Sequence, residues 1–313
     1  MLKRTSILTV AFACFILAIT GCQQADFAPV YNVGDVDSYK VTRETVKEVS
    51  FEQPSLNKSK LDTTKSVVEM TFDQKVDNVN EDGSVVLDIT IKGIKLYSKG
   101  QKGVNNDFDS TRDADKKDAL NKLIGKSYKI KMDVDGKATV ADVSGIKSSA
   151  TSREAKALIS SDAIEMRHSI IPMPEEGPAV IAKNKSWMTL GATPKGALQP
   201  KAFEKEYKVE SIKDTAEGSV ADVKMTAIET NKTVEGFDAS SGGLGVMANI
   251  FDSTSNYTGD MKYNITTGKL VSYSENLTTE HVAAEEPKGG DPSKGPDVLT
   301  MRFISKYSIE SVK

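Results

Sequence analysis

Segments of strand length rich in apolar and β-branched residues recur along most of this chain and constrain its fold more than any other feature. Seven of them occupy residues 66–76, 84–96, 127–134, 205–212, 219–230, 257–265 and 270–279. Successive side chains of a strand point to opposite faces, so each segment can bury one face. The separators carry a Gly where a hairpin needs a positive φ, and they lie at 81–83, 135–137, 216–218 and 267–269. The sequence therefore predicts a mainly β (α+β) fold made of antiparallel sheet.

Two helices are expected between the strands. Residues 113–124 begin with acidic side chains, place their apolar side chains on one face and end before Gly125, a favoured residue just after a helix. Residues 152–169 follow Thr151, which has Glu154 at capping-box spacing, and align an apolar stripe. Both helices should pack on the sheet.

The same landmarks appear twice in the same order. Ser38-Tyr39 matches Ser186-Trp187, the turn at 81–83 matches 216–218, Phe108-Asp109-Ser110-Thr111 recurs as Phe251-Asp252-Ser253-Thr254, and the turn at 135–137 matches 267–269. We interpret this as one module used twice, 33–170 and 182–313, with a helical insertion in the first copy only. The Pro-rich segment 171–181 connects the copies. The expected architecture is two similar antiparallel modules that form a curved, half-barrel-like sheet with the two short helices packed on it.

The N-terminus has the features of an export signal. Lys3 and Arg4 precede an apolar run over 7–19, and small residues lead to Gly21 and Cys22. This end resembles a bacterial lipoprotein signal peptide, in which cleavage falls before a Cys that receives the lipid. An ordinary signal peptide, or a membrane anchor with a chance Cys, is the alternative.

The lipoprotein resemblance implies an address for the chain. Residues 1–21 would be the signal peptide, Cys22 would carry a lipid such as palmitate, and 22–32 would be a lipidated polar tether. Because Gln23 is not Asp, the resemblance implies an outer membrane in a cell that has one. We therefore expect a cell-envelope protein that is bound to a membrane through its N-terminal lipid and folded outside the cytoplasm.

A second resemblance covers most of the remaining chain. The residues that carry it are Val33, Gly34, Asp35, Tyr39, Gly125, Lys126, Ser127, Asp133, Asp135, Gly136 and Lys137. Their order is similar to that in an uncharacterised family of secreted bacterial proteins, often lipoproteins. These motifs are turns and strand starts, so the resemblance implies no catalytic or binding residue. In the second copy, Lys183-Asn184-Lys185 replaces the Gly-Asp start.

Charge and cysteine content exclude several classes of function. Loss of the leader leaves 39 of the 41 Lys and Arg against 44 Asp and Glu, a formal net charge of −5, so we expect no nucleic-acid partner. Cys14 would leave with the leader and Cys22 would be lipidated, so no thiol remains for a disulfide or a metal site. We predict no cofactor and no metal.

Three motifs imitate ligand-binding loops. Residues 243–248 match a dinucleotide fingerprint without the strand and helix that it needs, so we interpret them as a Gly-rich loop. Gly125-Lys126-Ser127 imitates a phosphate loop, but Leu120 stands where the first Gly is required. Asp133, Asp135 and Gly136 resemble the start of a calcium loop that would close on Ser144 instead of Glu, so a hairpin turn is predicted.

No catalytic residue is predicted. The histidines, His168 and His281, have no nucleophile elbow nearby and are expected at the surface. Asp107 with Asp109 could bind a divalent ion weakly, although nothing in the sequence specifies one. Trp187 is expected to pack in the core.

Three functional hypotheses follow. The first is a non-catalytic, membrane-anchored carrier or binding module for an apolar ligand. The second is a scaffold or assembly partner in the envelope, acting on another envelope protein through exposed strand edges or the loop at 291–296. The third is a hydrolase with a carboxylate-based site among the 44 acidic side chains.

Overall fold

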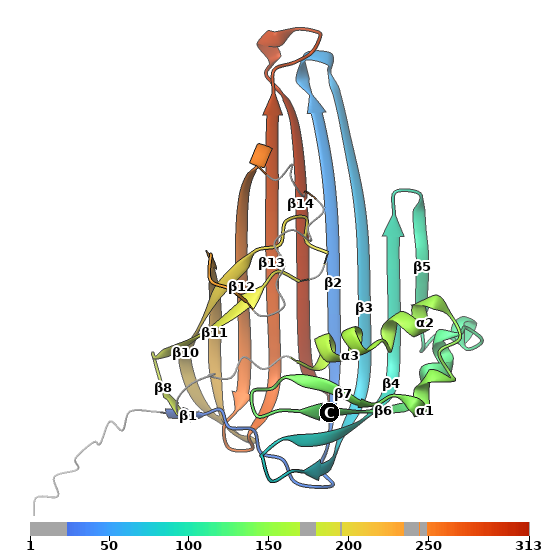
Figure 1. Cartoon of the computed structure of the whole chain (residues 1–313), viewed down its shortest axis with the longest axis vertical. Helices are drawn as coiled ribbons and strands as arrows, with labels where there is room; N and C mark the ends of the chain where they lie inside the picture. Colours follow the sequence, from blue (N-terminus) through green and yellow to red (C-terminus); the bar gives the residue numbers. More distant parts are fainter. Residues whose placement is uncertain (1–23, 170–179, 195, 235–243, 245–248, 313) are drawn as a thin grey trace, which may run out of the picture.

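One long antiparallel sheet dominates the molecule (Figure 1). The computed structural model describes residues 24–169, 180–194, 196–234, 244 and 249–312. The twelve strands of the sheet are β2 (Val36–Gln53), β3 (Lys58–Val79), β4 (Val85–Gly100), β5 (Gly103–Asp109), β6 (Ser127–Met132), β7 (Ala138–Asp142), β9 (Ser186–Ala192), β10 (Ala202–Thr215), β11 (Gly218–Thr230), β12 (Asp252–Asn264), β13 (Lys269–Glu285) and β14 (Asp297–Val312). The prediction of a mainly β, antiparallel fold is confirmed.

The strand order has the same pattern on both sides of the sheet. It runs β7-β6-β4-β3-β2 in the N-terminal half and β13-β12-β11-β10-β9 in the C-terminal half, and β14 lies between β2 and β13. In the first half, β5 and β6 pair with successive parts of β4, so together they take the position that the unbroken β12 has beside β11. The expected insertion lies between β5 and β6. The two halves therefore share one continuous sheet.

The hairpin turns lie where the Gly residues predict them. Gly83, Gly136, Gly218 and Gly268 all have positive φ. Gly268 is the most constrained, because a Cβ at this position would lie 2.5 Å from Val30 Cγ2 in addition to the unfavourable φ of +64°. The turn before β13 thus requires Gly.

The sheet has an inner and an outer face. The short helices and the β6–β7 hairpin lie over the lower part of the inner face (Figure 1), which carries large apolar side chains there, including Val41, Met70 and Phe72. On the outer face of the same strands, charged residues form ion pairs such as Lys40 with Glu310 and Lys65 with Glu44. This alternation lets one sheet build a core on one side and meet water on the other.

The helices are shorter than predicted. Residues 113–124 form two 3₁₀ turns, Asp113–Asp115 and Leu120–Leu123, instead of one α-helix. The Asp115 carboxylate accepts from the backbone N–H of Asp109, and that of Asp118 accepts from Leu120, so these side chains satisfy backbone donors in a non-helical path.

The second predicted helix is interrupted at Ile159 and Ser160. It forms α2 (Arg153–Leu158) and α3 (Ser161–His168), after a further helix, α1 (Ser144–Lys147). Ser160 caps α3 by accepting from the N–H of Ala163, which starts a new helix there. The cap of α2 is Ser152, one residue later than predicted.

Within the expected tether, 22–32, residues 24–27 pack on the fold, whereas residues 28–32 form no helix or strand. Strand β1 (Gln24–Asp26) pairs with β8 (Val180–Ala182) in a small second sheet. Phe27 is fully buried, with its ring centroid 5.1 Å from that of Trp187 and 5.5 Å from that of Tyr263. Burial of a large aromatic ring lowers the free energy of the folded chain, even where the neighbouring residues are polar. The tether interpretation gave too little weight to Phe27.

The two central hairpins form the far end of the molecule. Strands β2, β3, β13 and β14 extend beyond their neighbours and end at the 3₁₀ turns Pro54–Leu56 and Pro292–Lys294 (Figure 1). The two tips touch, because the N–H of Asp291 donates to the carbonyl of Ser55 over 3.2 Å. Within the described residues, no helix is long and apolar enough to cross a membrane.

Candidate ligand-binding cleft

A cleft of about 1010 Å³ opens on the inner face of the sheet. The β6–β7 hairpin and α3 form one wall, and β9 with the residues that follow it forms the other. The floor side chains come from β2, β10, β12, β13 and β14, and they are Arg43, Lys205, Tyr207, Tyr257, Tyr273, Glu275, Leu277, Ser305 and Tyr307. This volume lies at the upper end of the range of about 300–1,000 Å³ for small-molecule sites.

A buried ion pair lies at the centre of the floor. Lys205 Nζ lies 2.6 Å from Glu275 Oε1, and the two side chains are only 12% and 16% exposed. Tyr257 donates to the other carboxylate oxygen over 2.5 Å, and Tyr273 also donates to Glu275. Lys205 additionally lies 4.5 Å from the centroid of the Tyr257 ring. Both carboxylate oxygens of Glu275 therefore accept hydrogen bonds from charged or aromatic donors.

These contacts fix the charge state of the pair. Burial alone would raise the pKa of Glu275, but the Lys205 ammonium and the donated hydrogen bonds outweigh it and lower the pKa below its ordinary value. Burial and the nearby Glu275 carboxylate raise the pKa of Tyr257 and Tyr273, so both phenols stay protonated donors. The centre of the cleft is thus an ionised pair surrounded by neutral tyrosines.

Arg43 stands at the same level of the sheet, two strands from Glu275. In the register, Glu275 faces Tyr307 and Tyr307 faces Arg43. The Arg43 guanidinium lies 6.0 Å from the centroid of the Tyr307 ring and donates to Met166 Sδ on α3. Burial lowers the pKa of Arg43 from its ordinary value. The row therefore places a cation, a phenol and an ion pair side by side.

Both histidines are buried, so their predicted surface positions are wrong. His168 is 3% exposed, shares a 2.8 Å hydrogen bond with the hydroxyl of Tyr128 and packs edge-on against Phe72. His281 is fully buried and lies 2.7 Å from the Ser253 hydroxyl through Nδ1. Burial lowers the pKa of each imidazole below 6.5. Neither residue lines the cleft, and His168 serves to fix α3 against the sheet.

Trp187 is buried as predicted and lies next to the cleft. It is 8% exposed, and its ring stacks on that of Tyr207 with centroids 5.3 Å apart. Tyr207 in turn lines the cleft floor and lies 3.2 Å from the hydroxyl of Tyr273. The indole therefore lies one side chain away from the cleft.

The loop motifs have structural explanations. Asp133 and Asp135 belong to the predicted hairpin turn, in which the N–H of Asp133 donates to the carbonyl of Lys137, and this turn forms part of the cleft rim. Gly125 ends the 3₁₀ turn with φ +75° and donates to the carbonyl of Ile91. Of residues 243–248 only Leu244 is described, so the Gly-rich motif lies outside the described residues.

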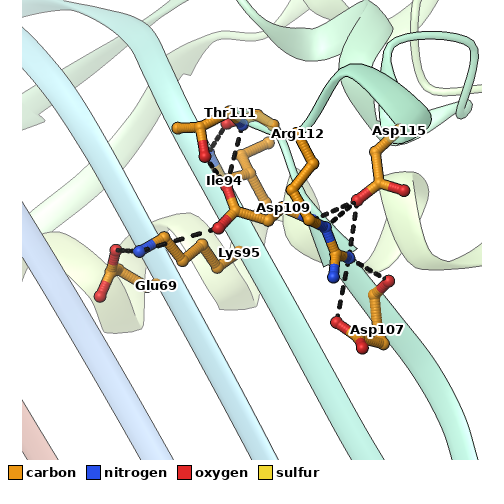
Figure 2. Close-up of polar contacts among 9 residues, drawn as sticks. Glu69, Ile94, Lys95, Asp107, Asp109, Thr111, Arg112 and Asp115 are labelled. Atoms are coloured by element: carbon orange, nitrogen blue, oxygen red, sulfur yellow. Dashed lines mark hydrogen bonds and ion pairs between the residues drawn. The ribbon is translucent and has the colours of Figure 1, made fainter.

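The acidic residues around Asp107 and Asp109 contact cations of the protein itself (Figure 2). Arg112 lies 3.0 Å from Asp107 and 2.6 Å from Asp115. Asp109 accepts from Thr111 and lies 3.9 Å from Lys95, which also pairs with Glu69. Across the described part of the chain, no group of three or more His, Cys, Asp and Glu side chains could hold a metal ion. These aspartates organise the end of β5.

The charged residues of the cleft were not predicted from the sequence. The sequence does contain one indication of the site. Arg43 continues the inward-facing series of Tyr39 and Val41 on β2, and a charged side chain at an inward-facing position is unusual. The predicted lipidation site, with Gly21 and Cys22, lies outside the described residues and stays a prediction.

Comparisons with known proteins give no family. No family model matches the chain, and no curated protein matches it. Among solved structures, it resembles one described as showing lipid–protein interactions in lipovitellin, with TM-score 0.41, 8% identity and 91% of this chain covered, but it spans only 26% of that protein. It also resembles DynF of the dynemicin pathway of Micromonospora chersina, with TM-score 0.16, 5% identity and coverage of 91% and 85%.

A third match is Pseudomonas aeruginosa OpdL, with TM-score 0.19, 9% identity and coverage of 88% of this chain and 98% of that one. All three scores lie below 0.5. Functional conclusions therefore have to come from the residues of the cleft.

Proposed function

We propose that this protein is a membrane-anchored, non-catalytic lipoprotein of the bacterial cell envelope whose inner-face cleft binds the acyl chain of an apolar or amphiphilic ligand. The observation that carries the proposal is a cleft of about 1010 Å³ floored by four tyrosines and Leu277. Aromatic and aliphatic walls with a few placed polar groups are typical of small-molecule sites. The resemblance of the N-terminus to a lipoprotein signal, ending at Cys22, supports the proposed location in the cell envelope.

The state of Glu275 favours binding over hydrolysis. A carboxyl that acts as a general acid needs a raised pKa, whereas the pKa of Glu275 is lowered by Lys205 and by two phenols. Both of its oxygens already accept hydrogen bonds. The third hypothesis, a carboxylate-based hydrolase, therefore gains no support from this residue.

Ligand binding can be measured through the single Trp. A chain lying on Tyr207 should change the emission of the stacked Trp187, and mass spectrometry of the purified protein should detect lipid that copurifies with it. Thr189→Glu places a charge in the cleft wall, beside the floor residue Lys205, and should weaken binding of oleate, used below its micelle concentration, at least tenfold. Thr226→Glu is the matched control, because Thr226 is exposed on β11 and does not line the cleft. Equal affinity of both variants, or no binding by the wild type, would reject the proposal.

The proposed address has a separate test. Cys22→Ala should abolish lipid attachment and release the protein from membranes without changing its fold. Retention of this variant in membranes after a high-salt wash would contradict the lipoprotein interpretation.

A scaffold remains the second candidate, and one edge of the sheet favours it. Strand β9 ends the strand order, and Met188 and Leu190 on it are 55% and 39% exposed. Such an edge can add a strand from another chain. Cross-linking in cells that recovers one envelope protein through β9, and loses it in Met188→Lys, would support this role; no reproducible partner would count against it.

A further inference from the structure

Among the described residues, no carboxylate lies within ion-pair distance of Arg43, although this residue lies in the cleft floor. The Glu275 carboxylate, two strands away, acts on it only at longer range. Within the described part of the chain, the one hydrogen-bond acceptor of Arg43 is Met166 Sδ, and its one aromatic contact is the Tyr307 ring. A thioether is a weak acceptor, so most of the five guanidinium donors lack a strong one. Charged side chains that are partly shielded from water are ordinarily paired with an opposite charge.

A second cation raises the positive charge at this place. Arg167 on α3 is 7% exposed and donates to the hydroxyl of Tyr128 and the carbonyl of Leu158, both uncharged acceptors. It is near enough that its charge, after burial, contributes to lowering the pKa of Arg43. Lys205 is balanced by Glu275. Among the described charges at and beside the cleft floor, Arg43 and Arg167 therefore have no carboxylate within ion-pair distance, whereas Lys205 has one.

The rim of the cleft carries mainly negative charge. Asp133, Asp135, Asp162 and Glu165 lie there, with Lys137 as their counterpart. Asp135 and Asp162 are exposed, so water and salt screen them more than the half-buried Arg43 and the buried Arg167. A small free anion gains little by passing this rim. An anion on an acyl chain also gains about 0.8 kcal/mol for each CH₂ group buried on the floor.

We propose that Arg43 binds the anionic head group of an amphiphile, and that the attached acyl chain lies over the tyrosines and Leu277. This assignment rests on the proposed function of the cleft and adds the chemical class of the ligand. The planar guanidinium suits a carboxylate or a phosphate ester, because two of its donors can reach two oxygens at once.

The test compares two ligands that share one chain. Oleate and oleyl alcohol, below their aggregation concentrations, are titrated into the purified protein by calorimetry and by Trp187 fluorescence. The wild type should bind oleate at least tenfold more tightly than the alcohol, since a hydrogen bond to a charged group is worth about 1.5–3 kcal/mol. Sodium acetate should bind far more weakly than either, which separates an amphiphile from a free anion.

Variants locate the preference. Arg43→Gln should reduce oleate affinity to that of the alcohol and leave the alcohol unchanged, and Arg43→Lys should restore part of the preference. Arg302→Gln is the matched control, because Arg302 lies on the outer face and pairs with Glu280 and Glu48. It should keep the wild-type ratio. Thermal melting of each variant checks that it is folded.

The outcomes separate the two proposals. Equal binding of oleate and oleyl alcohol by the wild type overturns the anion assignment and leaves the acyl-chain cleft intact, and this comparison needs no variant. A preference that survives Arg43→Gln overturns the role of Arg43. Acetate competing with oleate at equal concentration shows a free-anion site and overturns the amphiphile. No binding of either lipid overturns the proposed function and this inference together.

Discussion

The two faces of the large sheet carry the same charged residue types in different surroundings. On the outer face, Lys40 pairs with Glu310 while both side chains stay at least a third exposed. On the inner face, Lys205 pairs with Glu275 at less than half that exposure, and two tyrosines complete the contacts. The comparison shows that the contribution of an ion pair to stability depends on how deeply the pair is buried. Outer pairs add little stability, whereas the inner pair is costly to break and defines the cleft.

Removing the inner carboxylate should have the largest effect. Glu275→Ala leaves the Lys205 ammonium buried without its partner, and we expect a loss of about 3–5 kcal/mol in the free energy of unfolding. Urea denaturation measures it. The matched outer change, Glu310→Ala, should cost less than about 1 kcal/mol. Similar losses in both variants would show that the two faces do not differ in this respect.

A double substitution sharpens the same point. Lys205→Met with Glu275→Leu removes both charges, so it should recover most of the loss caused by Glu275→Ala alone. A double variant as unstable as the single one would mean that packing, and not the unpaired charge, causes the loss.

The inner face also depends on the N-terminal segment. Phe27→Ala removes a ring between Trp187 and Tyr263 and should lower the free energy of unfolding by about 3 kcal/mol. Val33→Ala is the control from the same segment, because Val33 is 66% exposed, and it should change stability by less than about 0.5 kcal/mol. Little effect of Phe27→Ala would restore the tether interpretation.

Acid should act first through the inner face. His168 and His281 have folded-state pKa values below 6.5, so only the unfolded chain takes up protons as the pH falls below that value. Their contribution is complete above pH 6.5 and decreases below it, by up to about 1.4 kcal/mol per pH unit for each group. Glu275 adds a loss of the same sign only below its ordinary pKa of 4.5.

The histidine contribution can be isolated. Between pH 6.5 and 5, His168→Gln should show about half of the wild-type slope of unfolding free energy against pH. An unchanged slope would mean that His168 is protonated in the folded protein.

The smallest effect is expected from an outer arginine. Arg302 is 44% exposed and pairs with Glu280 and Glu48. Arg302→Gln should change stability by less than about 1 kcal/mol at low salt, and the difference should disappear in 1 M salt. A larger, salt-independent loss would show that the outer pairs contribute as the inner one does.

Local signals in the sequence predicted local structure well. The alternating segments and the turns at Gly83, Gly136, Gly218 and Gly268 form as expected, because strand faces and positive φ are set by neighbouring residues. Long-range pairing was not accessible in this way. Nothing in the sequence near β14 shows that it pairs with β2, more than 240 residues earlier, or that β8 takes up β1.

The candidate site was missed for a related reason. Lys205, Glu275 and Arg43 come from three separate strands, and each alone looks like one of many surface charges. The approach of Arg43 to Glu275 depends on the register between β13, β14 and β2. The approach of Lys205 depends on the pairing of β10 with β13 through β11 and β12. The two buried histidines likewise depend on the partners Tyr128 and Ser253, which no local pattern connects to them.

The early start of β1 sets how the protein would stand on a membrane. Gln24 is already paired with Ala182, and Cys22 is only two residues away, a span of at most about 7 Å. A lipid on Cys22 would then hold the folded part close to the bilayer, because no long flexible linker separates the two. The folded part would have little freedom to move away from the membrane or to rotate relative to it. Strand β2 has 18 residues and is therefore about 60 Å long. The tips at Pro54 and Pro292, at the far end of this strand, would then lie at a fixed distance from the membrane.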